Sequence, residues 1–262
     1  MYPAHYRKNV ADNPWFWTAN HAGRNSRVRL VCLPYAGGGA GVFAPWAKLL
    51  PESIDVWAAR LPGRESRWKE TPLTDVAVIA SALAAEIEPY LTDLPIVFFG
   101  YSVGSLIGFE LLRELRRRAV PFQPALFIAV ARGAPQLPLR MAPVHHLSDQ
   151  EFLDAIGRRY QGIPKMVLED KELLNLYLPP LRADIQVNES YRYRDEPSLD
   201  VPIVAMGGLD DPMVSLDDLA TWRAQTRSTF EMEVFPGGHF FGQEQRPQLI
   251  AALRRRLLDL RL

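Results

Sequence analysis

The sequence has very little cysteine: Cys32 is the only one in 262 residues, so it can form neither an internal disulfide nor a metal site built from several cysteines. Charge of one sign is also missing, because Lys and Arg total 30 and Asp and Glu total 30, which leaves no net field to attract nucleic acid or an anionic membrane. No apolar run approaches the roughly 18 residues of a membrane-spanning helix, and residues 1–23 lack the apolar core of a signal peptide. These absences predict a soluble, cytoplasmic protein that binds neither nucleic acid nor membrane.

Short apolar runs rich in β-branched and aromatic residues recur along the chain, separated by segments with helical periodicity. Several runs are apolar at successive positions, which is typical of strands buried on both faces. The predicted strands are 27–34, 54–59, 95–99, 125–131, 201–206 and 229–235, and the predicted helices are 42–50, 74–93, 103–118, 216–226 and 245–260. Such alternation predicts an α/β fold with a mostly parallel central sheet flanked by helices.

One connection interrupts this alternation. Between residues 134 and 200 the sequence contains helical segments but no convincing strand. Connections in α/β folds are usually about 2–6 residues, and long ones are often functional lids. We therefore interpret residues 1–262 as a single domain with a helical cap inserted over 135–195. A second independent domain is the alternative.

A candidate nucleophile lies where the predicted strand at 95–99 meets the helix at 103–118. The sequence there is Gly100-Tyr101-Ser102-Val103-Gly104, the G-x-S-x-G pattern of a nucleophile elbow. Small residues on either side of the serine allow a sharp strand-to-helix turn that exposes its hydroxyl at the sheet edge. Ser102 is therefore the candidate nucleophile. The alternative is that Ser102 simply caps the following helix.

A serine nucleophile needs a base and an acid that orients the base, and in this architecture both follow the serine in the chain, the acid first. His239 follows the last predicted strand in a glycine-rich loop, which is where the base is expected. His145 and His146 lie in the predicted cap and need no catalytic role. The acid should follow the strand at 201–206, and its spacing from the neighbouring glycine and valine favours Asp211 over Asp210.

Acyl transfer also needs N–H donors for the oxyanion. One donor should be the backbone N–H of Val103, directly after the nucleophile. The other should come from the glycine-rich loop after the first predicted strand, where the N–H of Ala36 is the candidate and that of Gly37 the alternative. A phosphate-binding role for this loop is excluded, because no Gly-Lys-Ser/Thr follows and no complete G-x-G-x-x-G begins at its glycines.

With these residues placed, the sequence resembles the type II thioesterases, the stand-alone editing enzymes of nonribosomal peptide and polyketide synthesis. The resemblance covers most of the chain and extends beyond the triad. Four segments carry it: RLVCLPYAGGGAGVFAPWAKLLP at 29–51, ARLPGRESR at 59–67, LPPLRADI at 178–185 and PGGHFF at 236–241. Tyr35 and Tyr101 depart from the family pattern, which often has histidine at both positions.

The resemblance implies an α/β-hydrolase fold and hydrolysis of acyl thioesters held on the phosphopantetheine arm of a carrier protein. It assigns Ser102 as nucleophile, Asp211 as orienting acid, His239 as base, and the N–H groups of Ala36 and Val103 as oxyanion donors. No metal or dissociable cofactor is expected, the partner is an acyl or peptidyl carrier domain, and the enzyme is expected to be a monomer. A general carboxylesterase, or a product-releasing thioesterase or acyltransferase with the same triad, is the alternative.

A cluster of basic residues follows the second predicted strand: Arg60, Arg64, Arg67 and Lys69. This cluster could contact an acidic carrier protein. Solvated charges or structural ion pairs explain it equally well.

Overall fold

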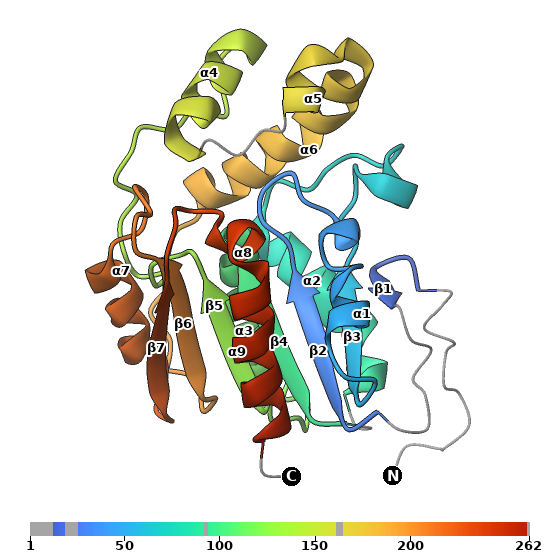
Figure 1. The fold of residues 1–262 in the computed structure, drawn as a ribbon, viewed down its shortest axis with the longest axis vertical. Helices are drawn as coiled ribbons and strands as arrows, with labels where there is room; N and C mark the ends of the chain where they lie inside the picture. The colour runs from blue at the N-terminus through green and yellow to red at the C-terminus, as the bar shows by residue number, and fades with distance from the viewer. Residues whose placement is uncertain (1–12, 19–25, 92–93, 161–164, 261–262) are drawn as a thin grey trace.

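The computed structural model describes residues 13–18, 26–91, 94–160 and 165–260. Its centre is a sheet with the strand order β1-β3-β2-β4-β5-β6-β7 (Figure 1). The strands are β1 (Phe16–Thr18), β2 (Val28–Leu33), β3 (Ile54–Ala59), β4 (Ile96–Tyr101), β5 (Leu126–Val130), β6 (Ile203–Gly208) and β7 (Phe230–Phe235). β1 pairs antiparallel with β3, and the other strand pairings within these ranges are parallel. The predicted α/β class with a mostly parallel sheet is confirmed.

All six predicted strands are present, and their ends differ from the prediction by two residues at most. The strand predicted at 201–206 is displaced furthest and begins at Ile203, because Pro202 has no N–H to donate to a ladder. The edge strand β1 was not predicted. Its three residues are too few to show a periodic pattern, and only the pairing with β3 makes them a strand.

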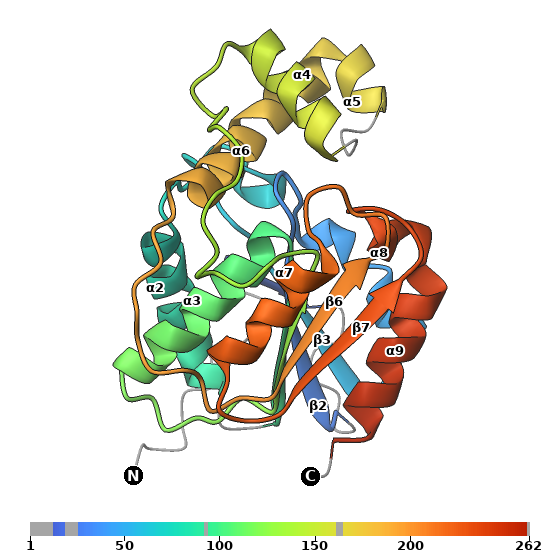
Figure 2. The ribbon, with the colours of Figure 1, turned by 90° about the vertical axis from the view of Figure 1, so that its left-hand side faces the viewer.

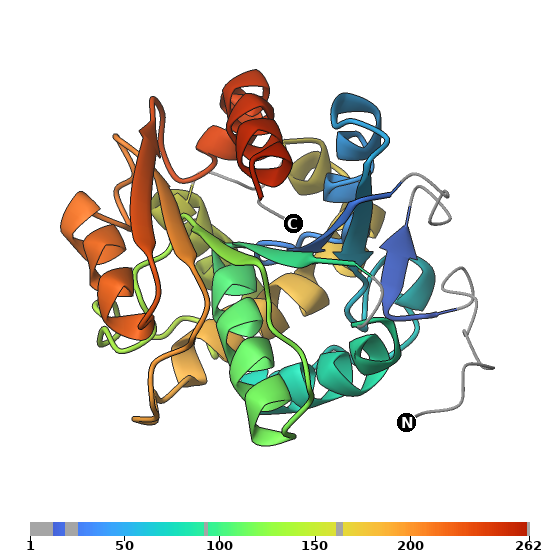
Figure 3. The same ribbon diagram turned by 90° about the horizontal axis from the view of Figure 1, so that it is seen from below.

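Helices cover both faces of the sheet (Figure 3). One face packs against α2 (Val76–Ile87), α3 (Val103–Arg117) and α7 (Leu216–Ala220), and the other against α1 (Trp46–Leu49), α8 (Phe241–Glu244) and α9 (Arg246–Leu258). Each interface is a separate apolar core, with the sheet between them. This two-sided burial explains why the strands are apolar at successive positions.

The predicted helix at 103–118 is observed as α3, but the other four are shorter or divided. Short 3-10 helices account for several of the breaks: η2 (Ala40–Val42), η4 (Glu88–Tyr90) and η5 (Thr221–Gln225). A further 3-10 helix, η3 (Glu65–Arg67), follows β3 outside the predicted helices. α2 begins after Asp75, whose carboxylate accepts N–H bonds from the first turn, and ends before Pro89. The last two residues of the helix predicted at 74–93 lie outside the described residues.

Three helices lie between β5 and β6 in the sequence: α4 (Asp149–Tyr160), α5 (Lys165–Glu169) and α6 (Lys171–Ser190). They lie over the edge of the sheet at which the parallel strands end (Figures 1 and 2). α4 and α6 share a small apolar core of their own, which includes Phe152, Ile156, Leu181 and Ile185. We call these three helices the cap; residues 161–164 of the predicted segment are outside the described residues.

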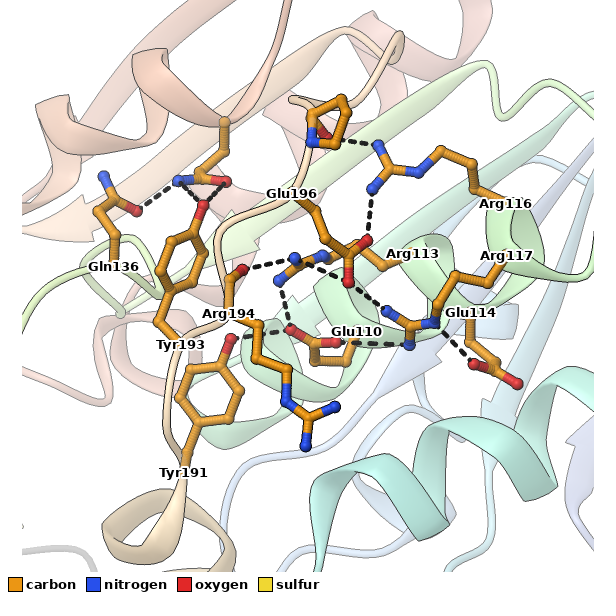
Figure 4. Close-up of polar contacts among 12 residues, drawn as sticks. Glu110, Arg113, Glu114, Arg116, Arg117, Gln136, Tyr191, Tyr193, Arg194 and Glu196 are labelled. Carbon is orange, nitrogen blue, oxygen red and sulfur yellow. Dashed lines mark hydrogen bonds and ion pairs between the residues drawn. The ribbon is translucent and has the colours of Figure 1, made fainter.

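The chain that returns from the cap to β6 is fastened to α3 by a network of polar contacts (Figure 4). The Tyr191 hydroxyl donates to Oε1 of Glu110 at 2.8 Å, and Nη1 of Arg113 donates to the same oxygen at 3.0 Å. Arg116 and Arg117 both donate to the carboxylate of Glu196, at 2.7 and 2.8 Å. The cap is thereby tied to the helix that follows Ser102.

No helix in the described ranges is long and apolar enough to cross a membrane.

Candidate active site

Ser102 lies in a sharp turn between β4 and α3. Its φ of +53° is in the left-handed region, and its N–H donates to the carbonyl of Val130 at 2.8 Å. A Cβ at Gly100 would lie 2.4 Å from the carbonyl oxygen of Gly104, and one at Gly104 would lie 2.2 Å from that of Leu33. Both positions therefore require glycine, because no side chain fits where β2, β4 and α3 approach each other.

The Ser102 side chain does not cap α3, since its hydroxyl makes no capping hydrogen bond to the helix. Instead, Oγ lies 3.1 Å from Nε2 of His239. This distance is within hydrogen-bonding reach, and the two residues are 137 positions apart in the sequence. The geometry favours the nucleophile interpretation over the helix-capping alternative.

Asp211 is the carboxylate that contacts His239. Its Oδ2 lies 2.8 Å from Nδ1 of the imidazole, while its Oδ1 accepts the N–H groups of Met213 and Val214 at 2.8 and 3.2 Å. Asp210 is exposed, and its backbone N–H donates to the carbonyl of Gly237 at 3.0 Å. The structure therefore brings Ser102, His239 and Asp211 into one hydrogen-bonded line.

Tyr101 fixes the loop that carries His239. Its buried hydroxyl donates to the carbonyl of His239 at 2.7 Å and accepts the N–H of Gly242 at 3.2 Å. Burial raises the pKa of Tyr101 well above its usual value, so the hydroxyl keeps its proton. Sequence reasoning gave this residue no role, although a tyrosine directly before the nucleophile in a buried strand signals a hydroxyl in need of partners.

Asp184 of the cap helix α6 holds the loop after β2. Its Oδ2 accepts the N–H of Gly37 at 2.8 Å, and both of its oxygens accept from Arg64, at 2.6 and 2.9 Å. Arg64 also donates to the carbonyl of Gly38 at 3.0 Å. Burial alone would lower the pKa of Arg64, but the adjacent Asp184 carboxylate raises it overall. Three of the family-like segments therefore meet at one buried contact.

This contact bears on the choice of oxyanion donor. The N–H of Gly37 is already committed to Asp184, which argues against it as the second donor. Ala36 and Val103, the two residues favoured by the sequence, line the same cavity as Ser102. Between Ala36 and Gly37, Ala36 is therefore the better candidate for the second donor.

The basic cluster after β3 is largely structural. Arg64 is buried and pairs with Asp184. Arg67 is also buried; it pairs with Glu70, and its Cζ lies 4.1 Å from the ring centre of Trp15. Arg60 donates to the backbone carbonyl of Phe16. Because these three arginines are committed to intramolecular contacts, a structural role is favoured for them over a carrier-binding one. Lys69, the fourth member of the cluster, is exposed, and its ammonium lies 5.2 Å from the ring centre of Trp68.

His145 and His146 precede α4 and are held against the cap helix α6. Nδ1 of His145 lies 2.7 Å from the buried carboxylate of Glu189, and the ring of His146 packs edge-on against that of His145. In the described parts of the chain, no cluster of three or more His, Cys, Asp or Glu side chains is arranged to hold a metal ion.

Two cavities meet at Ser102 and His239. The first has a volume of about 30 Å³ and is mainly apolar, with Ala36, Val103, Ile156, Tyr177 and Leu181 in its walls. The second has a volume of about 150 Å³ and is more polar, with Arg132, Tyr160, Asn188 and Met213 among its lining residues. Residues of the cap helices α4 and α6 form one wall of the first cavity.

Comparison with known proteins identifies the family of the chain. The thioesterase domain family model matches residues 28–257. The chain belongs to the thioesterase family. The enzyme is 40% identical over 245 residues to the gramicidin S biosynthesis protein GrsT of Aneurinibacillus migulanus, covering 94% of each chain.

Solved structures agree with this assignment. The type II thioesterase BorB of the borrelidin biosynthetic cluster superimposes on the thioesterase with a TM-score of 0.83 and 34% identity, covering 93% of this chain and 97% of BorB. YbtT, the type II thioesterase of the yersiniabactin NRPS/PKS pathway, gives a TM-score of 0.80 and 27% identity, covering 93% and 98%. The predicted α/β-hydrolase fold and the resemblance to type II thioesterases are confirmed, and the protein is a thioester hydrolase.

Proposed function

We propose that this thioesterase removes acyl groups from the phosphopantetheine arms of carrier proteins in nonribosomal peptide or polyketide synthesis, and so regenerates blocked carriers. The line of contacts from Ser102 through His239 to Asp211, at the sheet edge beneath the cap, carries the proposal. The 40% identity to a gramicidin S biosynthesis protein, over 94% of each chain, supports a role in such synthesis.

In the proposed acylation step, Nε2 of His239 takes the proton from Ser102 as Oγ attacks the thioester carbonyl. Asp211 holds the other ring nitrogen protonated and stabilises the imidazolium that forms. The developing oxyanion would be bound by the N–H groups of Ala36 and Val103; losing one such donor typically costs about 10²–10³ in rate. The thiol then leaves readily, because its pKa of about 8.5 is far below that of an alcohol.

In the proposed deacylation step, His239 takes a proton from water, which attacks the acyl-serine and releases the acid. Each step uses only side chains, backbone N–H groups and water. We therefore propose that the enzyme needs no metal or dissociable cofactor. Dialysis against a chelator should leave its activity unchanged, and a loss restored by added metal would contradict this.

We infer that the cap acts as a lid that admits the arm and selects the acyl group. Its apolar residues Ile156 and Leu181 line the cavity at Ser102. We further infer that the enzyme is a cytoplasmic monomer and binds its carrier as a separate protein. Light scattering of the purified enzyme, alone and with a carrier domain, would test the oligomeric state and the complex.

The deciding experiment loads a carrier protein with an acetyl or other short acyl group and follows its intact mass. The wild-type enzyme should restore the free phosphopantetheine form. Ser102→Ala should lose this activity by roughly 10⁴–10⁶-fold, because no other group replaces the nucleophile. Melting temperatures of both proteins show whether the variant remains folded.

A wild-type enzyme that hydrolyses simple esters quickly but leaves the acyl carrier untouched would contradict the proposal. That result would favour a general carboxylesterase with the same triad. Release of only long acyl chains, with no effect on short ones, would favour a product-releasing enzyme.

A further inference from the structure

Arg132 is a cationic side chain that lines a cavity shared with the nucleophile. It follows β5 by two residues, after Ala131, whose φ of +52° turns the chain at the sheet edge. The carbonyl of Val130 accepts the N–H of Ser102, so the two segments are hydrogen-bonded to each other. Arg132 and Ser102 line the same 150 Å³ cavity, together with His239.

The guanidinium of Arg132 has few partners. Nη1 donates to the amide oxygen of Asn188 on α6 at 2.5 Å, while Nε is buried without a hydrogen-bond partner. No carboxylate among the described residues is paired with it. Burial lowers the pKa of Arg132 to about 10, and the group therefore remains charged at neutral pH. A partly buried cation with one neutral acceptor is costly unless an anion completes its environment.

Carboxylates near this cavity are not free to supply that anion, and Asp211 is itself held by His239. Glu110 flanks it through Tyr191, and Glu189 and Asp218 belong to its lining. Each of the three is engaged by another arginine: Glu110 by Arg113 (Figure 4), Glu189 by Arg159, and Asp218 by Arg140. The positive charge of Arg132 is thus left facing the cavity in which the substrate reacts.

We propose that Arg132 binds a carboxylate carried by the acyl group of the substrate, so that the enzyme accepts acyl thioesters ending in a carboxylate a few bonds from the thioester carbonyl. An arginine binds a carboxylate through two parallel charge-assisted hydrogen bonds. The phosphate of the carrier arm is the other anion in such a substrate. It is separated from the sulfur by the whole pantetheine chain, whereas Arg132 lines the same cavity as Ser102, and this position favours the acyl group.

This inference deepens the proposed function and rests on Ser102 being its nucleophile. The test uses N-acetylcysteamine thioesters, which contain neither the phosphate nor the carrier protein. Malonyl is compared with 3-methylbutanoyl, and succinyl with 4-methylpentanoyl; in each pair two methyl groups replace the carboxylate oxygens. Arg132→Gln should lower kcat/KM for the carboxylate member of each pair by about 10- to 100-fold relative to its neutral partner.

Two further variants separate recognition from structure. Arg132→Lys keeps the charge and should recover part of the preference for the carboxylate substrates. Asn188→Ala removes the protein partner of Arg132 but keeps the cation, so the ratio between paired substrates should be retained. The melting temperature of Arg132→Gln should not fall, because a partly buried charge without an anionic partner is removed.

An unchanged substrate ratio in Arg132→Gln would overturn the inference. An equal loss for all four substrates would overturn it too and would assign Arg132 to the pantetheine portion or to the structure of the cap. Hydrolysis of none of these thioesters by the wild-type enzyme would instead contradict the thioesterase chemistry itself. The failure of a carrier-protein assay alone would leave the Arg132 result standing.

Discussion

At the residue scale, two adjacent carboxylates after β6 have different surroundings. Asp211 points toward His239, and its side chain is almost completely buried at 1% exposure. Its second oxygen is held by two backbone N–H groups, so the side chain has little freedom to rotate. Asp210 lies beside it in the sequence but is exposed. The turn after Gly208 decides which of the two carboxylates reaches the imidazole.

Asp211→Asn should lower kcat by roughly 10³–10⁴-fold, because an amide cannot hold Nδ1 of His239 protonated and leaves the ring in the wrong tautomer. Asp210→Asn is the matched control and should change kcat less than about twofold, since its side chain is exposed. Steady-state kinetics on one thioester measures both variants. Equal losses in the two would contradict the assignment of Asp211.

At the element scale, the position of Ser102 depends on how closely α3 approaches β2 and β4. Gly104 on α3 touches the backbone of Leu33, and Gly100 touches the backbone of Gly104. Backbone atoms cannot move aside as flexible side chains can. The close approach is therefore a property of the sheet and helix together, and the serine is exposed because of it.

Gly104→Ala should destabilise the protein by about 4 kcal/mol or more, since its Cβ would lie 2.2 Å from a backbone carbonyl oxygen. Gly157→Ala in α4 is the control. A Cβ at Gly157 would meet nothing within 4 Å, and alanine favours helix by about 0.5–1 kcal/mol, so this variant should be slightly more stable. Urea denaturation curves measure both changes, and a tolerated Gly104→Ala would contradict the close approach.

Asp184 joins the cap to the loop after β2 through the N–H of Gly37, and to the segment after β3 through its buried pair with Arg64. Asp184→Ala should cost about 3–5 kcal/mol of stability, because Arg64 would remain buried without its partner. Asp149 pairs with Arg182 across the cap but is 75% exposed, so Asp149→Ala should cost at most about 1 kcal/mol. Thermal unfolding distinguishes the two, and similar melting temperatures for both variants would contradict the role given to Asp184.

At the scale of the whole molecule, the sheet separates two apolar cores and is protected on both sides. Cys32 lies in β2, between β3 and β4, and is completely buried. Burial raises the pKa of its thiol well above the usual value, so little reactive thiolate forms. The single cysteine can therefore report on opening of the central sheet.

Native protein should react very slowly with a thiol reagent such as DTNB, and the rate should rise steeply across the denaturation transition. Because Cys32 lies in a central strand, its labelling requires extensive unfolding. The rate is compared with that of protein in full denaturant, where the thiol is exposed. Fast labelling under native conditions would show that the sheet opens locally near β2.

The sequence by itself determined the features that depend on local pattern. The six parallel strands follow from runs of successive apolar residues, and the elbow at Ser102 follows from its two glycines. The order of Ser102, Asp211 and His239 along the chain, with each candidate after a strand, was enough to predict that the three side chains meet at one edge. Parallel strands end at a common edge, so residues after different strands are brought together there.

Only the tertiary structure decided the contacts between segments far apart in the chain. Arg64 and Asp184 are 120 residues apart, and neither sequence segment alone indicates that they pair beneath the cap. The edge strand β1 exists only through its pairing with β3. The lack of an anionic partner for Arg132 was likewise visible only in the structure, because it depends on where the neighbouring carboxylates lie. Ion pairing, burial and cavity shape depend on three-dimensional neighbours, and these are set by the packing of the whole chain.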